Sequence, residues 1–308
     1  MLGRGLHTVH PDGGASMSAL LTCVGTEMDQ REIEANGLTF RAREHGEGAP
    51  VLLLHGFPET SRMWVPLMER LGREGFHCLA PDQRGYSPGA QPADADEYTY
   101  DHFADDVFGL MDAMGWERAH LIGHDWGGLA GWAAVDKRPE RVLSWVPMSV
   151  PHIRAFGTAI RENEEQRQRS GYVQFFRQVG TAEAALSAND YQALRNIYKD
   201  THSAEEIEEC IAVLSEEGAL TGALNWYRGT SGIRPDHAEG GKFGPVATPT
   251  LHIWGSADTA IGRVATMATR EQMTGPYELL ELDCAHWIVQ EAFEQIVGPI
   301  VAHLKKYG

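Results

Sequence analysis

Three polar residues that are far apart in the chain have the types and the order that nucleophilic catalysis needs: Asp125, Asp258 and His286. Asp125 is the central residue of Gly123–Gly127 (Gly-His-Asp-Trp-Gly), a pattern typical of a sharp strand-to-helix turn that exposes its middle side chain. A carboxylate, with a reference pKa of about 3.9, is ionised at neutral pH and needs no base to attack carbon. The pattern therefore predicts displacement at a saturated carbon, with an ester of Asp125 as intermediate. The alternative is that Asp125 only caps the following helix.

Asp258 and His286 have the positions of an acid and a base. Asp258 follows the predicted strand Leu251–Trp254, and His286 follows Tyr277–Leu282. The carboxyl ends of strands are where sheets of this kind place their sites. His286, with a reference pKa of about 6.5, would take a proton from water, and Asp258 would fix its tautomer. Asp283 is a rival acid, but it is too close to His286 along the chain for an easy approach.

A loop after the apolar run Val51–Leu54 supplies the expected oxyanion donors. The loop reads His-Gly-Phe-Pro-Glu, residues 55–59, and we expect the backbone N–H groups of Phe57 and Trp126 to hold the negative oxygen. Losing one such donor typically lowers the rate by ~10²–10³.

Strands and helices alternate around these residues. Asn36-Gly37 predicts a hairpin turn within Glu32–Glu44, because this pair suits a two-residue turn. Further strands are expected at Phe76–Ala80, Ala119–Ile122 and Val142–Val146, with helices near 64–71, 103–114, 129–134 and 287–304. This order predicts an α/β fold: a mostly parallel sheet with helices on both faces.

At Pro151 the composition changes, and the strand pattern stops until about residue 235. Helices are expected at Ile153–Arg169, Gly171–Gln178, Ala182–Leu186, Tyr191–Tyr198, Ala204–Ser215 and Ala219–Tyr227. We therefore predict an all-helical cap at 151–235, inserted into a core of 29–150 and 236–308. Residues 1–28 lack periodicity and are predicted to form a loosely ordered tail.

The composition excludes several classes of function. The net charge of −17 argues against nucleic acid or an anionic membrane as a partner, since both reward basic patches. No run approaches the ~20 apolar residues of a membrane span. The four cysteines are far apart and favour a reducing cytoplasm. Without a dinucleotide or metal-binding motif, no cofactor or metal is expected. A monomer and a homodimer both remain open.

Together these motifs resemble the α/β-hydrolase-fold epoxide hydrolases, the group that contains the soluble epoxide hydrolases. The resemblance rests on HGFPE at 55–59, DQRGYS at 82–87, GHDWGG at 123–128 and the placement of Asp258 and His286. It covers roughly residues 30–308, including the cap. It implies hydrolysis of a small-molecule epoxide to a vicinal diol without a cofactor.

The resemblance also implies roles for cap residues. In that family two cap tyrosines hydrogen-bond to the epoxide oxygen, and the matching positions are Tyr172 and Tyr227. The match at Tyr172 is looser, so Tyr191 and Tyr198 are possible substitutes. A phenol with a reference pKa of about 10 can protonate the departing alkoxide and is itself protonated at neutral pH. The remaining pocket residues are expected to be His55, Pro58, Phe176, Trp226 and Trp287.

Two other functions are compatible with parts of the sequence. A haloalkane or haloacid dehalogenase shares the fold and the elbow aspartate, but often has Asn where this chain has Phe57, or Arg where it has Trp126. A non-catalytic receptor of hydrolase fold can tolerate loss of catalytic residues, whereas this chain contains all three.

Overall fold

A computed structural model describes residues 28, 30–198, 200–230 and 243–308. The predicted tail lies outside the described residues except for Met28, and so does the predicted end of the cap at residue 235. Within the described residues, none of the helices combines the length and the apolar character that crossing a bilayer requires.

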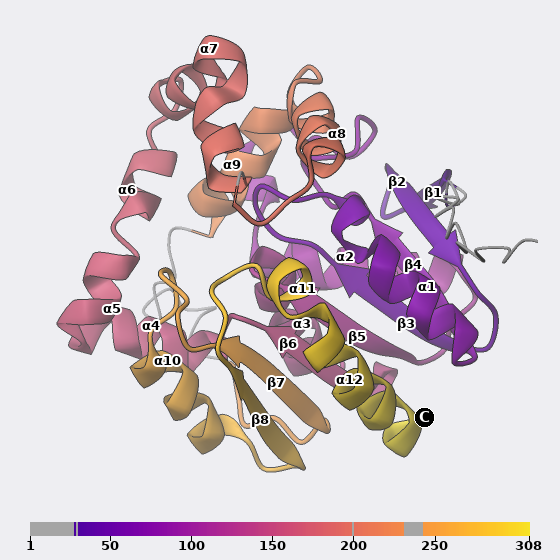
Figure 1. The fold of residues 1–308 in the computed structure, drawn as a ribbon. Helices are drawn as coiled ribbons and strands as arrows, with labels where there is room; N and C mark the ends of the chain where they lie inside the picture. Colours follow the sequence, from indigo (N-terminus) through magenta and orange to yellow (C-terminus); the bar gives the residue numbers. More distant parts are fainter. Residues whose placement is uncertain (1–27, 29, 199, 231–242) are drawn as a thin grey trace, which may run out of the picture.

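One sheet of eight strands, in the order β1-β2-β4-β3-β5-β6-β7-β8, runs through the molecule (Figure 1). The pairs β1–β2 and β2–β4 are antiparallel, and all other neighbours are parallel. The predicted mostly parallel sheet is therefore confirmed. The strands are β1 (Gln30–Ala35), β2 (Leu38–His45), β3 (Ala49–Leu54), β4 (Phe76–Pro81), β5 (Ala119–His124), β6 (Val142–Met148), β7 (Thr250–Gly255) and β8 (Tyr277–Leu282).

The predicted hairpin joins β1 to β2 at Asn36 and Gly37. Their φ angles are +53° and +75°, the left-handed region that a two-residue hairpin turn requires at both central positions. Asn and Gly adopt this region more readily than other residues, which explains why this pair predicted the turn.

Helices cover both faces of the sheet, because alternate strand residues point to opposite sides. Val51 and Leu53 of β3 belong to one buried cluster, with α1 (Val65–Arg73) and α12 (Phe293–Tyr307). Leu52 and Leu54 belong to the other, with α2 (Tyr100–Ala113) and α3 (Trp126–Lys137). A strand buried on both sides reads as a continuous apolar run, as predicted for this one.

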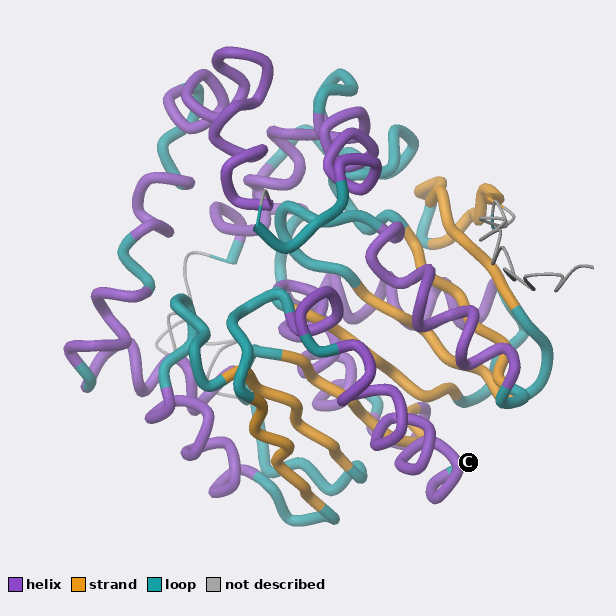
Figure 2. The backbone as a smooth tube through the Cα atoms, viewed as in Figure 1, coloured by secondary structure: helices purple, strands orange, loops and turns teal. Residues whose placement is uncertain are grey.

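The described part of the segment between β6 and β7 contains helices and loops, and it lies beyond one end of the sheet (Figures 1 and 2). We use the name cap for residues 151–198 and 200–230 of this segment. Its helices are α4 (Ile153–Glu162), α5 (Glu164–Arg169), α6 (Tyr172–Phe176), α7 (Thr181–Tyr198), α8 (Ala204–Leu214) and α9 (Ala219–Gly229).

Two helix predictions were wrong in detail. The single helix predicted at Ile153–Arg169 is interrupted at Asn163, which is extended and caps α5 by accepting from the Gln166 N–H. The separation predicted between the helices before and after residue 190 is confirmed, because α7 consists of two helical stretches divided by a kink with non-helical angles at Ala188–Tyr191. The C-terminal helix is interrupted at Ala292, which separates α11 (Ile288–Glu291) from α12.

Some short elements were not predicted. These are α10 (Arg263–Ala268) and the 3₁₀ helices η1 (Ser61–Trp64), η2 (Ala95–Glu97), η3 (Pro139–Arg141) and η4 (Thr269–Gln272).

Candidate active site

Asp125 occupies a strained turn between β5 and α3. Its φ is +50° and its ψ −121°, rare values for a residue with a side chain. The turn can be this tight because residue 127 is a glycine. A Cβ at this position would overlap the Leu54 carbonyl. Asp125 makes no side-chain capping bond to α3. Its Oδ1 instead accepts a hydrogen bond from the Phe57 N–H at 2.8 Å, so the geometry does not support the helix-capping alternative.

His286 lies between two carboxylates. Its Nδ1–H donates to Asp258 Oδ2 at 2.8 Å, while its Nε2 is 3.7 Å from Asp125 Oδ2. The second distance is too long for a hydrogen bond, so Nε2 faces the elbow carboxylate without being bonded to it. The other oxygen of Asp258 accepts from the N–H groups of Ala260 and Ile261. The structure thus brings Asp125, Asp258 and His286 together.

Asp283, the rival acid, is exposed. The hydrogen bond of His286 Nδ1 is made with Asp258 and not with Asp283.

Ser149 completes this group and was missed in the sequence. Its hydroxyl donates to Asp258 Oδ2 at 2.5 Å and lies 3.0 Å from His286 Nδ1. Ser149 is buried and has a φ of +68°. It directly follows β6, at the sheet edge that also carries Asp125, and this position was the available signal.

The charges in this group shift two pKa values in opposite directions. Burial lowers the pKa of His286, but the charge and hydrogen bond of Asp258 and the charge of Asp125 outweigh it and raise the pKa to about 9. Burial raises the pKa of Asp258, but the charge and hydrogen bond of His286 outweigh it and lower the pKa to about 2. The charges around His286 therefore favour its protonated form in the resting protein, which differs from the expectation that His286 titrates near its reference value.

His55 stabilises the loop whose Phe57 N–H donates to Asp125. The Nε2 of His55 accepts from the Gln83 N–H at 3.1 Å, and its Nδ1–H donates to the Gly56 carbonyl at 2.9 Å. Both ring nitrogens are used and the ring is fully buried. His55 therefore supports the loop and has no donor left for a ligand, which corrects its predicted place in the pocket wall.

The Phe57 N–H donates to Asp125, and Trp126 is the other residue whose backbone N–H is predicted to be an oxyanion donor. The Phe57–Pro58 peptide bond is cis. Trp126 is the first residue of α3, so its N–H has no acceptor within the helix. A Cβ at Gly56 would overlap the Asp125 carboxylate, so only glycine permits this close approach.

Tyr172 and Tyr227 come from different cap helices and lie near each other. Tyr172 begins α6 and Tyr227 is in α9, with 6.3 Å between their ring centroids. Tyr227 is 3% exposed and Tyr172 41%. Burial, the neighbouring Tyr172 and the charge of Asp125 raise the pKa of Tyr227 well above its usual value. Desolvation and the same charge raise the pKa of Tyr172. Both phenols are thus protonated acids within electrostatic reach of Asp125.

Aromatic rings surround the two phenols. Phe176 packs against Tyr172 at 5.4 Å and against Tyr227 at 5.1 Å between ring centroids. Phe57 contacts both Phe176 and Tyr227, at 5.2 and 5.4 Å. Trp126 meets Tyr227 at 4.8 Å. The surroundings of the phenols are therefore mainly aromatic, and the Trp126 side chain also hydrogen-bonds to Tyr227.

The other expected pocket residues differ in their contacts. Trp287 is half-buried and packs beside His286 at 5.0 Å. Trp226 stacks on Phe103 at 3.8 Å and donates its indole N–H to the Arg84 carbonyl, so it packs inside the core and offers no hydrogen bond to a ligand.

Pro58 is hydrogen-bonded to Tyr198, one of the two possible substitutes for Tyr172. The Pro58 carbonyl accepts from the Tyr198 hydroxyl at 2.5 Å. This bond occupies Tyr198, which leaves it unavailable as a substitute for Tyr172. Tyr191 is in the non-helical part of α7.

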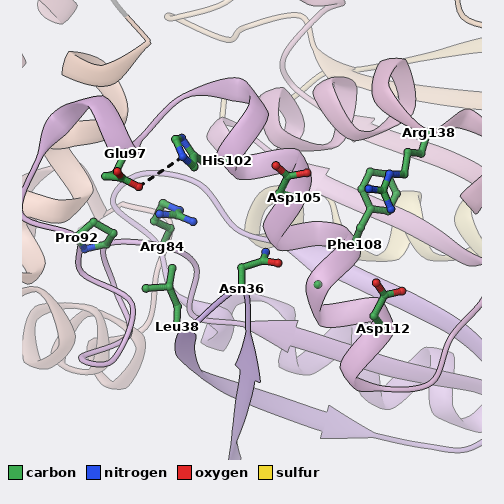
Figure 3. A pocket seen from close by; sticks show the side chains of 11 residues that line it. Asn36, Leu38, Arg84, Pro92, Glu97, His102, Asp105, Phe108, Asp112 and Arg138 are labelled. Carbon is green, nitrogen blue, oxygen red and sulfur yellow. Dashed lines mark ion pairs between the residues drawn. The ribbon is translucent and has the colours of Figure 1, made fainter.

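A separate surface pocket of about 370 Å³ has none of the predicted catalytic residues in its wall (Figure 3). Its wall is polar: His102 lies 3.5 Å from Glu97, and Arg138 stands over the ring of Phe108 at 5.0 Å. It lies over the β1–β2 hairpin and α2, away from the carboxyl ends of β5, β7 and β8.

Comparisons with known proteins give consistent results. A family model described as the alpha/beta hydrolase fold matches residues 49–292. The chain is 30% identical to epoxide hydrolase A of Mycobacterium tuberculosis, over 89% of this chain and 97% of that protein. It is 31% identical to epoxide hydrolase 4 of Mus musculus, over 89% and 78%. The crystal structure of epoxide hydrolase A from Mycobacterium thermoresistibile superposes with a TM-score of 0.80 at 28% identity, over 91% of this chain and 99% of that chain.

Proposed function

The chain belongs to the α/β-hydrolase family, and on that premise we propose that it hydrolyses small-molecule epoxides to vicinal diols through an ester on Asp125. The observation that carries the proposal is that two cap phenols, Tyr172 and Tyr227, lie 6.3 Å apart between ring centroids and both feel the charge of Asp125 in its strained turn. The relatives named epoxide hydrolases support the same conclusion.

The first step opens the ring. A carboxylate oxygen of Asp125 attacks one epoxide carbon, and the carbon–oxygen bond on its far side breaks. The departing oxygen would be an alkoxide, a poor leaving group, so it takes a proton from Tyr172 or Tyr227 as it forms. The phenols also orient the ring oxygen away from Asp125, which sets up attack from the back.

Ring opening changes the charge that His286 faces. Once Asp125 is an ester it is neutral, and one of the charges that raises the pKa of His286 is gone. The proton released from His286 replaces the one lost by the phenol. His286 is then neutral, as the second step requires.

The second step hydrolyses the ester. His286, oriented by Asp258, takes a proton from water, which attacks the ester carbonyl carbon. The negative charge develops on the oxygen that faces the Phe57 N–H, with the Trp126 N–H as second donor. The ester C–O bond then breaks, and the departing alkoxide takes the proton of the newly added hydroxyl and leaves as the diol. Asp125 is then again a carboxylate, and His286, which holds the proton from water, is again a cation.

The mechanism uses only side chains and backbone N–H groups, without a metal or a cofactor. A cytoplasmic location is part of the proposal, because Cys78, Cys210 and Cys284 are free and buried.

Product analysis tests the function. The protein is incubated separately with a panel of epoxides and with a haloalkane. We expect a vicinal diol from at least one epoxide and no halide. Halide release without diol would favour the dehalogenase, and binding without either product would favour a receptor.

A further inference from the structure

A buried carboxylate, Glu59, connects three parts of the protein. It follows the oxyanion loop residues Phe57 and Pro58, and it is 1% exposed. Its Oε1 accepts from His202 Nε2 at 2.5 Å and from Gln290 Nε2 at 2.8 Å. A buried carboxylate needs such partners, because an unpaired one would be strongly destabilising.

The cap holds the oxyanion loop at two adjacent residues. His202, between α7 and α8, binds Glu59, and Tyr198 of α7 binds the Pro58 carbonyl. Both side chains are buried. The second nitrogen of His202, Nδ1, is 2.8 Å from the Thr201 hydroxyl, which fixes the orientation of the ring.

The third connection leads toward His286. Gln290 belongs to α11, which begins two residues after His286. The indole of Trp287 lies between the two histidines, 5.0 Å from the His286 ring and 5.2 Å from the His202 ring. The oxyanion loop, the cap and the loop of the catalytic histidine therefore meet at one carboxylate.

We propose that His202 is a positioning residue: by binding Glu59 from the cap, it fixes the oxyanion loop so that the Phe57 N–H points at Asp125. The inference rests on the proposed function. His202 touches neither Asp125 nor His286 and acts through the loop. Its loss should move the donor, and a displacement near 1 Å can lower a rate about 10²-fold.

The two chemical steps respond to that displacement in opposite ways. Before ring opening, the Phe57 N–H stabilises the charged carboxylate, whose charge disappears as the ester forms. During hydrolysis, charge appears on the same oxygen, and the N–H stabilises the transition state more than the ester. A misplaced donor should therefore slow hydrolysis and leave ring opening unchanged or slightly faster.

The test compares His202→Phe, which removes the donor but keeps a ring, with His202→Gln, which keeps an N–H donor. His77→Phe is the matched control, because His77 Nε2 also pairs with a glutamate, Glu44, at 2.6 Å but lies on β4 away from the cap. The epoxide is one that the wild type turns over, chosen from styrene oxide, cyclohexene oxide and epoxyhexane. Single-turnover mixing and the intact mass of acid-quenched enzyme give the two rates separately.

For His202→Phe we expect ester hydrolysis to fall by about 10-fold or more, with ester accumulating during turnover, while ring opening keeps its rate. His202→Gln should recover most of the loss, and His77→Phe should behave as wild type. If His202→Phe slows both steps equally, or neither, the inference is overturned.

A second variant, Glu59→Gln, tests the same inference if His202→Phe does not fold. Glu59→Gln has the shape of glutamate but lacks its charge, and it should also slow hydrolysis selectively. If His202→Phe does not fold, normal hydrolysis in Glu59→Gln overturns the inference. A wild type that forms no ester with any epoxide would contradict the proposed function instead, which separates the two failures.

Discussion

Two histidine–carboxylate pairs contact the same indole, that of Trp287, and only one of the pairs faces the nucleophile. In the catalytic pair, His286 binds Asp258 through Nδ1 and leaves Nε2 3.7 Å from Asp125. In the cap pair, His202 binds Glu59 through Nε2, and its Nδ1 lies against the Thr201 hydroxyl. Each pair joins a histidine to a carboxylate, and the pairs differ in what the second nitrogen meets.

This difference shows that a histidine–carboxylate pair does not define a catalytic base. Carboxylates raise the pKa of both histidines against the opposing effect of burial. A general base also needs a nitrogen that water can reach beside the reacting atom. His286 meets this condition, whereas His202, with both nitrogens engaged inside the protein, can only hold its neighbours in place.

The largest expected effect comes from removing the carboxylate of Asp125, which the catalytic pair faces. Asp125→Ala should lower diol formation by about 10⁴-fold or more, because it removes the atom that bonds to substrate. No covalent adduct should appear in the intact mass. Normal turnover in this variant would mean that His286 activates water directly on the epoxide.

Removing the catalytic histidine should separate the two steps. His286→Gln should form the ester and then retain it, with turnover lowered by about 10³-fold or more, since a general base and the imidazolium are both lost. The adduct should be found on the peptide that contains Asp125. If His286→Gln loses turnover and shows no adduct, His286 is needed for ring opening and its assigned role is wrong.

The cap tyrosines should affect only ring opening, whereas the His202–Glu59 pair should affect only ester hydrolysis. Tyr227→Phe and Tyr172→Phe should each slow ring opening by about 10–10²-fold, as expected for loss of one of two proton donors. The effect should be larger for Tyr227, because it is buried and Tyr172 is 41% exposed. Single-turnover ester formation measures this, and an unchanged rate removes that tyrosine from the mechanism.

The smallest expected effect is on titration and stability. The folded pKa of His286, about 9, exceeds its unfolded value. The stabilisation that this gives is complete below the unfolded pKa of about 6.5 and is lost as the pH rises through about 9. Nuclear magnetic resonance of the imidazole should show the raised pKa, and Asp125→Asn should lower it. An unchanged pKa in that variant would mean that Asp125 does not influence His286.

The catalytic group could be predicted because its signals are local. The elbow motif, the strand ends before Asp258 and His286 and the chain order each depend on a few adjacent residues. Ser149 also follows a strand, but a serine there has many possible roles, so its type alone gave no reason to select it.

The cap pair and several helix ends could not be predicted, for physical reasons. Glu59 and His202 are 143 residues apart, and their contact exists only once the cap packs on the core. The interruption at Ala292 has no glycine or proline to mark it. Asn163 does have a signal, since Asn is a favoured N-cap, but the helix-forming residues around it favoured one continuous helix.

The most direct test of the covalent mechanism is a single turnover in water labelled with heavy oxygen, with enzyme in excess over epoxide. The account predicts that the first diol contains unlabelled oxygen from Asp125 and that the label appears in the peptide carrying this residue. A first diol that contains the label, with none in the protein, would contradict it.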